Sequence, residues 1–131
     1  MKIMKKLSLA SILILAGIAI YGIATHGQPQ SGAKPDPVKV DPKHYKVEFE
    51  NDHVRVLRIT YGPQEKSVMH YHPDGVVTYL TDGNIRMTTS DGKTIDQTGK
   101  AGQTTWTPAG AHLPQNIGDK KFEAILVELK K

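Results

Sequence analysis

Pairs of aspartate and glycine divide the chain from Tyr45 onward into short apolar or alternating segments. Asp82-Gly83 and Asp91-Gly92 are strong signals for two-residue hairpins, because glycine tolerates the positive φ that such turns require. No segment after residue 45 has a sustained helical period. Short strands with turn signals about every 8–12 residues are typical of a sandwich or a barrel. The sequence therefore predicts an all-β domain.

The expected strands are residues 45–50, 54–61, 67–72, 76–81, 84–89, 94–97, 103–107, 113–116 and 122–129. Isolated hairpins are marginal in water, so these strands are expected to close into a compact jelly-roll barrel. The last segment has apolar residues on both faces and is predicted to be covered on both sides.

The N-terminus has the composition of an export signal. Three lysines among the first six residues precede an apolar run from Leu7 to Ala24. This run of 18 residues is longer than the roughly 7–15 of a signal-peptide core and fits the roughly 17–25 of a membrane span. Residues 1–24 are interpreted as a signal peptide or a membrane-anchor helix that engages the membrane or the export machinery. Both interpretations predict an exported protein, either periplasmic or anchored to the inner membrane and facing the periplasm.

Residues 25–43 contain four of the eight prolines, together with Gly, Ser, Gln and Lys. This composition favours an extended chain and predicts a flexible, Pro-rich linker. His26 and His44, in or beside the linker, are expected to have no role. The globular domain is predicted over residues 44–131, and a chain of 131 residues has room for only one such domain.

Charge and cysteine content narrow the functional classes. The formal net charge is +4, but the three N-terminal lysines account for most of it, and the rest of the chain is close to neutral. A neutral body argues against nucleic-acid binding, which needs a basic face. The chain contains no cysteine, so disulfides, thiolate nucleophiles and Cys-ligated metals are excluded. A metal would have to be held by His, Asp, Glu or a neutral oxygen.

His70 and His72 are two residues apart on an expected strand, so their side chains project to the same face. Neutral imidazole is a favoured ligand of transition metals. A His-x-His pair alone is weak evidence for a metal site, because two surface histidines on a half-exposed strand give the same pattern. A second segment, from Gly102 to Asn116, adds His112 to the pair.

With that second segment the sequence resembles the cupin superfamily, whose two motifs are G(X)5HXH(X)3,4E(X)6G and G(X)5PXG(X)2H(X)3N. The first motif is matched by Gly62, His70, His72 and Gly83, with seven residues rather than five after the first glycine. The second motif is matched by Gly102, Pro108, Gly110, His112 and Asn116, with one residue fewer before the histidine. The resemblance covers residues 54–129. It implies a cupin-type jelly-roll β-barrel of the RmlC-like kind, with the three histidines as metal ligands.

One position departs from the family pattern. The glutamate of the first motif falls at Val76, and the alternative spacing, Val77, is also apolar. The usual set of three histidines and one glutamate is thus reduced to a histidine triad. Such a neutral triad leaves positions open for water, dioxygen or an anionic ligand, and the same departure is compatible with loss of the metal. The expected cofactor is a divalent transition metal, Fe, Mn, Ni, Zn or Cu, whose identity the sequence does not determine.

Four residues near the histidines are candidates for a ligand pocket. Val76 and Thr78 share a face of their expected strand, Trp106 lies one strand from His112, and Asn116 ends the second motif. Packing is the more frequent role for a lone tryptophan, and the motif asparagine is usually structural.

Three hypotheses for function remain open at the level of sequence. The first is a metal-dependent dioxygenase or other oxidoreductase acting on a small organic molecule. The second is a non-catalytic module that binds a metal or a small ligand, and the third is a structural cupin without a metal. No acid–base residue is identifiable from the sequence, and a fold alone does not choose among these functions. Because cupins often pair through outer strands, the resemblance also suggests a homodimer.

Overall fold

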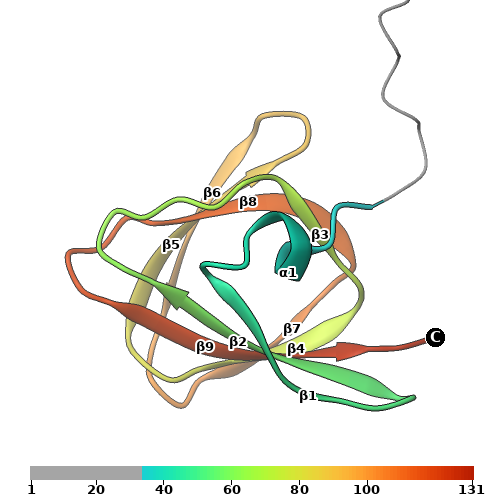
Figure 1. Ribbon diagram of the computed structural model, residues 1–131. Coiled ribbons are helices and arrows are strands. Elements are labelled where there is room, and N and C mark those ends of the chain that lie inside the picture. The colour runs from blue at the N-terminus through green and yellow to red at the C-terminus, as the bar shows by residue number, and fades with distance from the viewer. Residues whose placement is uncertain (1–33) are drawn as a thin grey trace, which may run out of the picture. The chain divides into compact units, whose positions relative to one another are not determined.

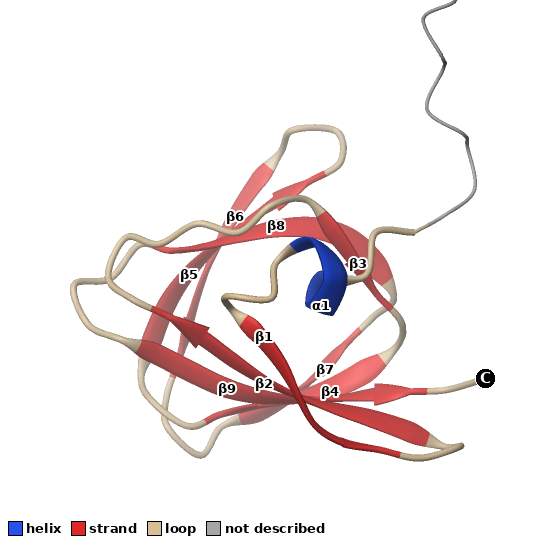
Figure 2. Cartoon of the chain, viewed as in Figure 1, coloured by secondary structure: helices blue, strands red, loops and turns tan. Residues whose placement is uncertain are grey.

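The computed structural model describes residues 34–131, and the predicted signal or anchor over residues 1–24 lies outside the described residues. Within the described range, no helix is long and apolar enough to cross a membrane. This range contains nine strands and one short helix (Figure 1 and Figure 2). The elements are α1 (Pro37–Val40), β1 (Tyr45–Glu50), β2 (Val54–Tyr61), β3 (His70–His72), β4 (Gly75–Tyr79), β5 (Gly83–Thr89), β6 (Thr94–Gly99), β7 (Thr104–Thr107), β8 (Gly110–Asn116) and β9 (Phe122–Leu129).

The strands form two antiparallel sheets. One sheet has five strands in the order β1-β2-β9-β4-β7, and the other has four in the order β3-β8-β5-β6. The chain crosses repeatedly between the two sheets, and they curve around a common interior (Figure 1). This architecture confirms the predicted all-β jelly-roll barrel, and each expected strand has a counterpart in it.

The inward-pointing side chains of β2 and β9, which alternate with outward ones, form the centre of the core. The register pairs Leu57 with Leu126 and Ile59 with Ala124, and all four side chains are buried. Tyr79 and Ile85 complete the same apolar cluster from β4 and β5. The inward positions of two hydrogen-bonded strands thus supply matching apolar pairs, which is how a sheet buries one of its faces.

The outer face of the five-stranded sheet carries an apolar row that crosses every strand. Cross-strand pairing connects, in order, Phe49, Val56, Val127, Val76 and Trp106. The two aromatic ends of the row are 53% and 55% exposed, so no element of residues 34–131 covers them. On the central strand β9, the inward residues are buried, the outward Ile125 and Val127 are half-buried and only Leu129 is exposed, so the strand is covered fully on one face and partly on the other.

Residues 34–44 differ from the flexible linker that their prolines predicted. Asp36 caps α1 by accepting a hydrogen bond from the Val38 amide (3.0 Å), and Pro37 occupies the first helical turn, where a missing N–H costs nothing. Pro37 and Asp41 are buried, and α1 contacts β1 and β3. The Asp-Pro pair is thus the start of a capped helical turn, and we call residues 34–44 the N-terminal strap.

Gly75 provides a test of the packing between β4 and β9. A Cβ atom built at this position would lie 2.5 Å from the backbone oxygen of Val127, which the sheet holds in place. We expect Gly75→Ala to lower the free energy of unfolding by about 1–3 kcal/mol, the usual cost of overpacking. Urea unfolding measures this change. Gly110→Ala is the matched control, because a Cβ there meets nothing within 4 Å, and an equal loss in both variants would contradict the packing described.

Candidate metal centre

Pairing between β3 and β8 brings the three predicted histidines together. His70 lies directly opposite His112 in the register, and His72 is on the same face as His70. His70 is 0% and His72 2% exposed, while His112 is half-buried. The side-chain nitrogens that these residues offer all lie within 4.8 Å of one another. The structure therefore assembles a histidine group that could hold a metal ion.

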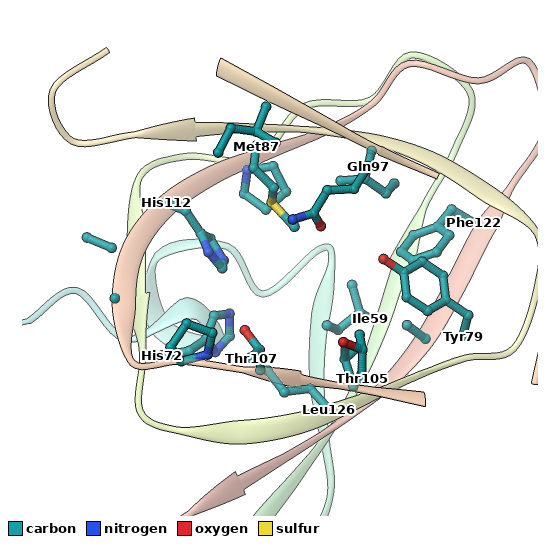
Figure 3. Close-up of a pocket in the computed structure, with 18 of the residues that line it drawn as sticks. Ile59, His72, Tyr79, Met87, Gln97, Thr105, Thr107, His112, Phe122 and Leu126 are labelled. Atoms are coloured by element: carbon teal, nitrogen blue, oxygen red, sulfur yellow. The ribbon is translucent and has the colours of Figure 1, made fainter. Parts of the chain in front are cut away.

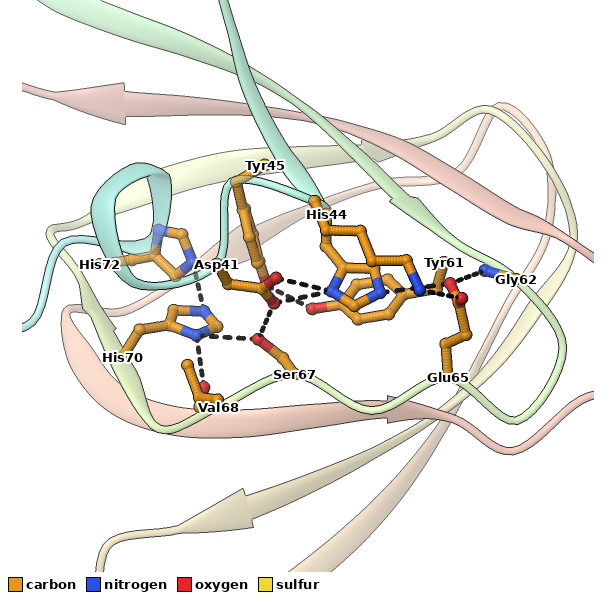
Figure 4. A network of polar contacts seen from close by, with 11 residues as sticks. Asp41, His44, Tyr45, Tyr61, Gly62, Glu65, Ser67, Val68, His70 and His72 are labelled. Carbon is orange, nitrogen blue, oxygen red and sulfur yellow. Dashed lines mark hydrogen bonds and ion pairs between the residues drawn. The ribbon is translucent and has the colours of Figure 1, made fainter.

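Hydrogen bonds fix which nitrogen two of these rings present. His70 donates from Nδ1 to the backbone oxygen of Val68 (2.8 Å), and His72 donates from Nδ1 to the carboxylate of Glu128 (2.6 Å). Their Nε2 atoms are 3.0 Å apart (Figure 4). With both protons on Nδ1, the two Nε2 lone pairs face each other, an arrangement that a cation relieves. The donor set thus fits a transition metal, and each ring has the outer partner that metal-ligating histidines usually have.

The electrostatics of the site keep the His70 and His112 rings neutral. Burial and the neighbouring His72 lower the pKa of His70 to about 4. Burial, followed by His72 and His70, lowers the pKa of His112 to about 3. A histidine must be deprotonated to bind a metal, so these two rings are ready for binding at neutral pH.

Glu128 is the functional residue that the sequence missed. It is 2% exposed and uses one oxygen for His72 and the other for Arg55 Nε, at 2.5 Å. Burial raises its pKa, but the hydrogen bonds from His72 and Arg55 outweigh burial and lower it overall. The carboxylate therefore stands behind a ligand rather than at the motif position of Val76 or Val77. Its signal in the sequence was an inward position on β9 in a series otherwise made of Phe122, Ala124 and Leu126.

A cavity of about 310 Å³ adjoins the histidines inside the barrel. His72 and His112 lie on one side of it, and Tyr79 and Phe122 lie on the opposite side (Figure 3). The described lining contains no Asp, Glu, Lys or Arg, and its polar side chains beyond the histidines and tyrosines are Thr89, Gln97, Thr105 and Thr107. Such a cavity suits a small and mostly apolar molecule.

None of the four predicted pocket residues lines this cavity. Val76 and Trp106 belong to the outer apolar row, and Thr78 on the same face contacts Thr104 at 3.0 Å between hydroxyls. The inward residues of β4 are Val77 and Tyr79, which both line the cavity. Val76 was expected in the pocket because the glutamate of the first motif falls there, but β3 and β4 belong to different sheets, and Val76 and Thr78 lie on the outer face of theirs.

Asn116 is buried, and its side chain holds two loops together by hydrogen bonds. Its amide donates to the backbone oxygens of Gly62 (2.9 Å) and Lys120 (2.7 Å) and accepts from the Gly118 amide (3.0 Å). It joins the loop after β2 to the loop before β9, and it does not line the cavity beside the histidines.

Comparison with known proteins agrees with this geometry. The model of a family described as Cupin domain matches residues 57–128, more than half of the chain. The chain belongs to the cupin family. A cupin domain from Bordetella pertussis Tohama I has 26% identity and a TM-score of 0.62, with 66% of this chain and 92% of that chain covered. An RmlC-like cupin family protein from Methanocaldococcus jannaschii has 22% identity and a TM-score of 0.52, with 78% and 93% covered. None of the curated proteins matches the chain.

The buried histidines of this cupin make its stability depend on pH. An unfolded histidine takes up a proton near its ordinary pKa of about 6.5, whereas the folded domain keeps His70 and His112 neutral down to about 4 and about 3. Below about pH 6.5 the unfolded state therefore binds more protons, and the free energy of unfolding falls as the pH is lowered. Urea unfolding of the chelator-treated protein checks this expectation. His112→Asn should show a shallower fall, and identical slopes in the two proteins would contradict it.

Proposed function

We propose that this cupin domain binds one divalent transition metal through His70, His72 and His112 and oxidises a small organic molecule held in the adjoining cavity. The observation that carries the proposal is the convergence of three histidine side chains, two of which, His72 and His112, line an apolar cavity of about 310 Å³. Two of the rings are oriented by acceptors behind them, as expected for ligands rather than for packing histidines. When bound, the metal would supply a centre that polarises an oxygen ligand or reacts with dioxygen.

The chain's own residues would bind and orient the organic molecule. Leu126, Met87 and Phe122 form apolar walls that exclude water, and Thr105 and Thr107 offer hydroxyl groups on β7. Burial raises the pKa of Tyr79, so its hydroxyl stays protonated. Because no carboxylate or amine of the described lining enters the cavity, a substrate with an uncharged body fits best.

The same lining supports a second candidate function. The described cavity offers no acid–base residue besides its histidines and tyrosines. A module that holds a metal and a small ligand without turnover needs no such residue, and it would use the same triad and the same cavity. We further propose that the domain acts outside the cytoplasm, which is supported by the three N-terminal lysines and the apolar run from Leu7 to Ala24.

Metal content tests metal binding by the triad, which both proposed functions require. We expect the purified full-length chain to contain close to one equivalent of metal, and His112→Ala to weaken metal affinity by more than about 100-fold because it removes a ligand. Elemental analysis and competition titrations with Fe, Mn, Ni, Zn and Cu measure this, since the affinity order alone favours Cu or Zn. His53→Ala is the matched control, because His53 is exposed and outside the triad. A metal-free protein that no added metal stabilises would contradict the proposal.

Oxygen uptake separates the enzyme from the binding module. We expect the iron-loaded protein to consume dioxygen with a member of a panel of thiols, phenols and diketones, and His70→Ala to abolish that consumption. An oxygen electrode measures the rate. Binding of panel compounds without any consumption would favour the non-catalytic module.

A further inference from the structure

The N-terminal strap, residues 34–44, lies directly against the strand that carries two of the histidines. Tyr71, between His70 and His72, donates its backbone amide to the oxygen of Pro35 at 2.8 Å. The Lys34 ammonium is 3.9 Å from the centre of the Tyr71 ring, and α1 contacts β3. The strap is therefore joined to β3 through both backbone and side-chain contacts.

A chain of polar contacts runs from His72 to the strap. Glu128 accepts from His72 Nδ1 at 2.6 Å and from Arg55 Nε at 2.5 Å. Arg55 in turn donates from Nη1 to Asp36 Oδ2 at 2.9 Å. The side chain is 17% exposed for Arg55 and 2% for Glu128, whereas that of Asp36 is 30% exposed, so the contact between Arg55 and Glu128 is the better shielded of the two. The orientation of His72 thus depends, through two intermediates, on a carboxylate of the strap.

A second chain runs from His70 to the strap (Figure 4). His70 Nδ1 is 3.4 Å from Ser67 Oγ, and this hydroxyl donates to Asp41 Oδ2 at 2.5 Å. Asp41 also accepts from His44 Nδ1 at 2.7 Å, and His44 stacks on the Tyr61 ring with centroids 4.4 Å apart. His44, expected from the sequence to have no role, is instead 5% exposed and holds Asp41 in place.

Both chains end on carboxylates that the barrel strands do not supply. Within residues 34–131 no buried side-chain polar atom lacks a partner, so loss of either carboxylate would leave donors without acceptors. The two chains reach different rings and share no residue. The strap therefore supports each of the two deeply buried histidines separately.

We propose that Asp36 and Asp41 are positioning residues of the metal centre, and that docking of the N-terminal strap sets the geometry and affinity of the site. This inference rests on the proposed metal-binding function. The strap holds His72 through Asp36, Arg55 and Glu128, and it holds His70 through Asp41 and Ser67. A neutral amide in place of either carboxylate loosens one ring and leaves the three ligand side chains themselves unchanged.

Titration of the full-length chain in detergent with Co²⁺ tests the proposal. Asp41→Asn should weaken Co²⁺ affinity about 10–100-fold, as loss of an outer partner usually does, and should alter the visible absorption spectrum of the bound ion. Asp36→Asn should cause a smaller loss, because Arg55 keeps its contact with Glu128.

Asp96→Asn is the matched control. This exposed carboxylate on β6 accepts from Arg86 on β5 (2.7 Å), at the edge of the four-stranded sheet opposite β3, so the variant makes the same change of charge and breaks the same kind of ion pair. It should leave affinity and spectrum unchanged. A merely structural role of the strap would lower the melting temperature of the Asp36 and Asp41 variants without changing the affinity or spectrum of the folded protein. Wild-type affinity and spectrum in both variants would therefore overturn the inference.

If Asp41→Asn does not fold, Ser67→Ala still tests the chain of contacts from His70 to the strap. It removes the hydroxyl that connects His70 with Asp41 and leaves the contact between Asp41 and His44 in place. Weaker Co²⁺ binding with an altered spectrum supports the inference, and unchanged binding overturns the role of Asp41 in positioning His70. Failure of the wild-type chain to bind Co²⁺, Ni²⁺ or Zn²⁺ is a separate result, because it overturns the metal-binding function itself.

Discussion

The pairing of His70 with His112 across β3 and β8 is the constraint on which the rest of the site depends. Once these rings and His72 share the barrel interior, burial favours the uncharged form of His70 and His112, and each buried N–H needs an acceptor. The Val68 carbonyl meets this need for one ring and Glu128 for another. A buried carboxylate then requires a cation of its own, which Arg55 supplies. The surroundings of the triad follow from the burial of its rings.

The histidines and the cavity walls offer different kinds of contact to a ligand. The imidazoles provide the polar end, while Ile59, Leu126 and Phe122 contribute to a wall that offers few hydrogen bonds. A molecule that enters would gain free energy mainly by leaving water, and only its group nearest the histidines would be recognised by polar contacts. Orientation in this site is therefore set by the position of one polar end, and the rest of the ligand is selected by size.

Local patterns were enough to predict the strands, because alternation and turn chemistry are properties of neighbouring residues. They did not predict every pairing, since Asp82-Gly83 connects β4 and β5 of different sheets and is not a hairpin turn. The grouping of His112 with His70 and His72 came from the resemblance to the cupin motifs. The pocket residues could not be predicted in the same way. Val76 and Thr78 were chosen from the motif position of the missing glutamate, and only the pairing of β4 within its sheet shows that this face points outward. Glu128 contacts His72 although the two residues are 56 positions apart in the sequence, so no local pattern connects them. The strap was hidden for a different reason: its prolines predicted an extended linker, whereas the Asp36-Pro37 pair caps a helical turn.

The contact between Arg55 and Glu128 joins residues that are 73 positions apart. The strand of Glu128, β9, lies in the middle of the five-stranded sheet, between β2 and β4. Because a chain is synthesised from its N-terminus, every other strand emerges before this central one, and contacts of such sequence separation form late. All three histidines are thus present before the strand that supports His72 has been made. A chain that ends before β9 would carry all three histidines but lack the carboxylate that accepts from His72.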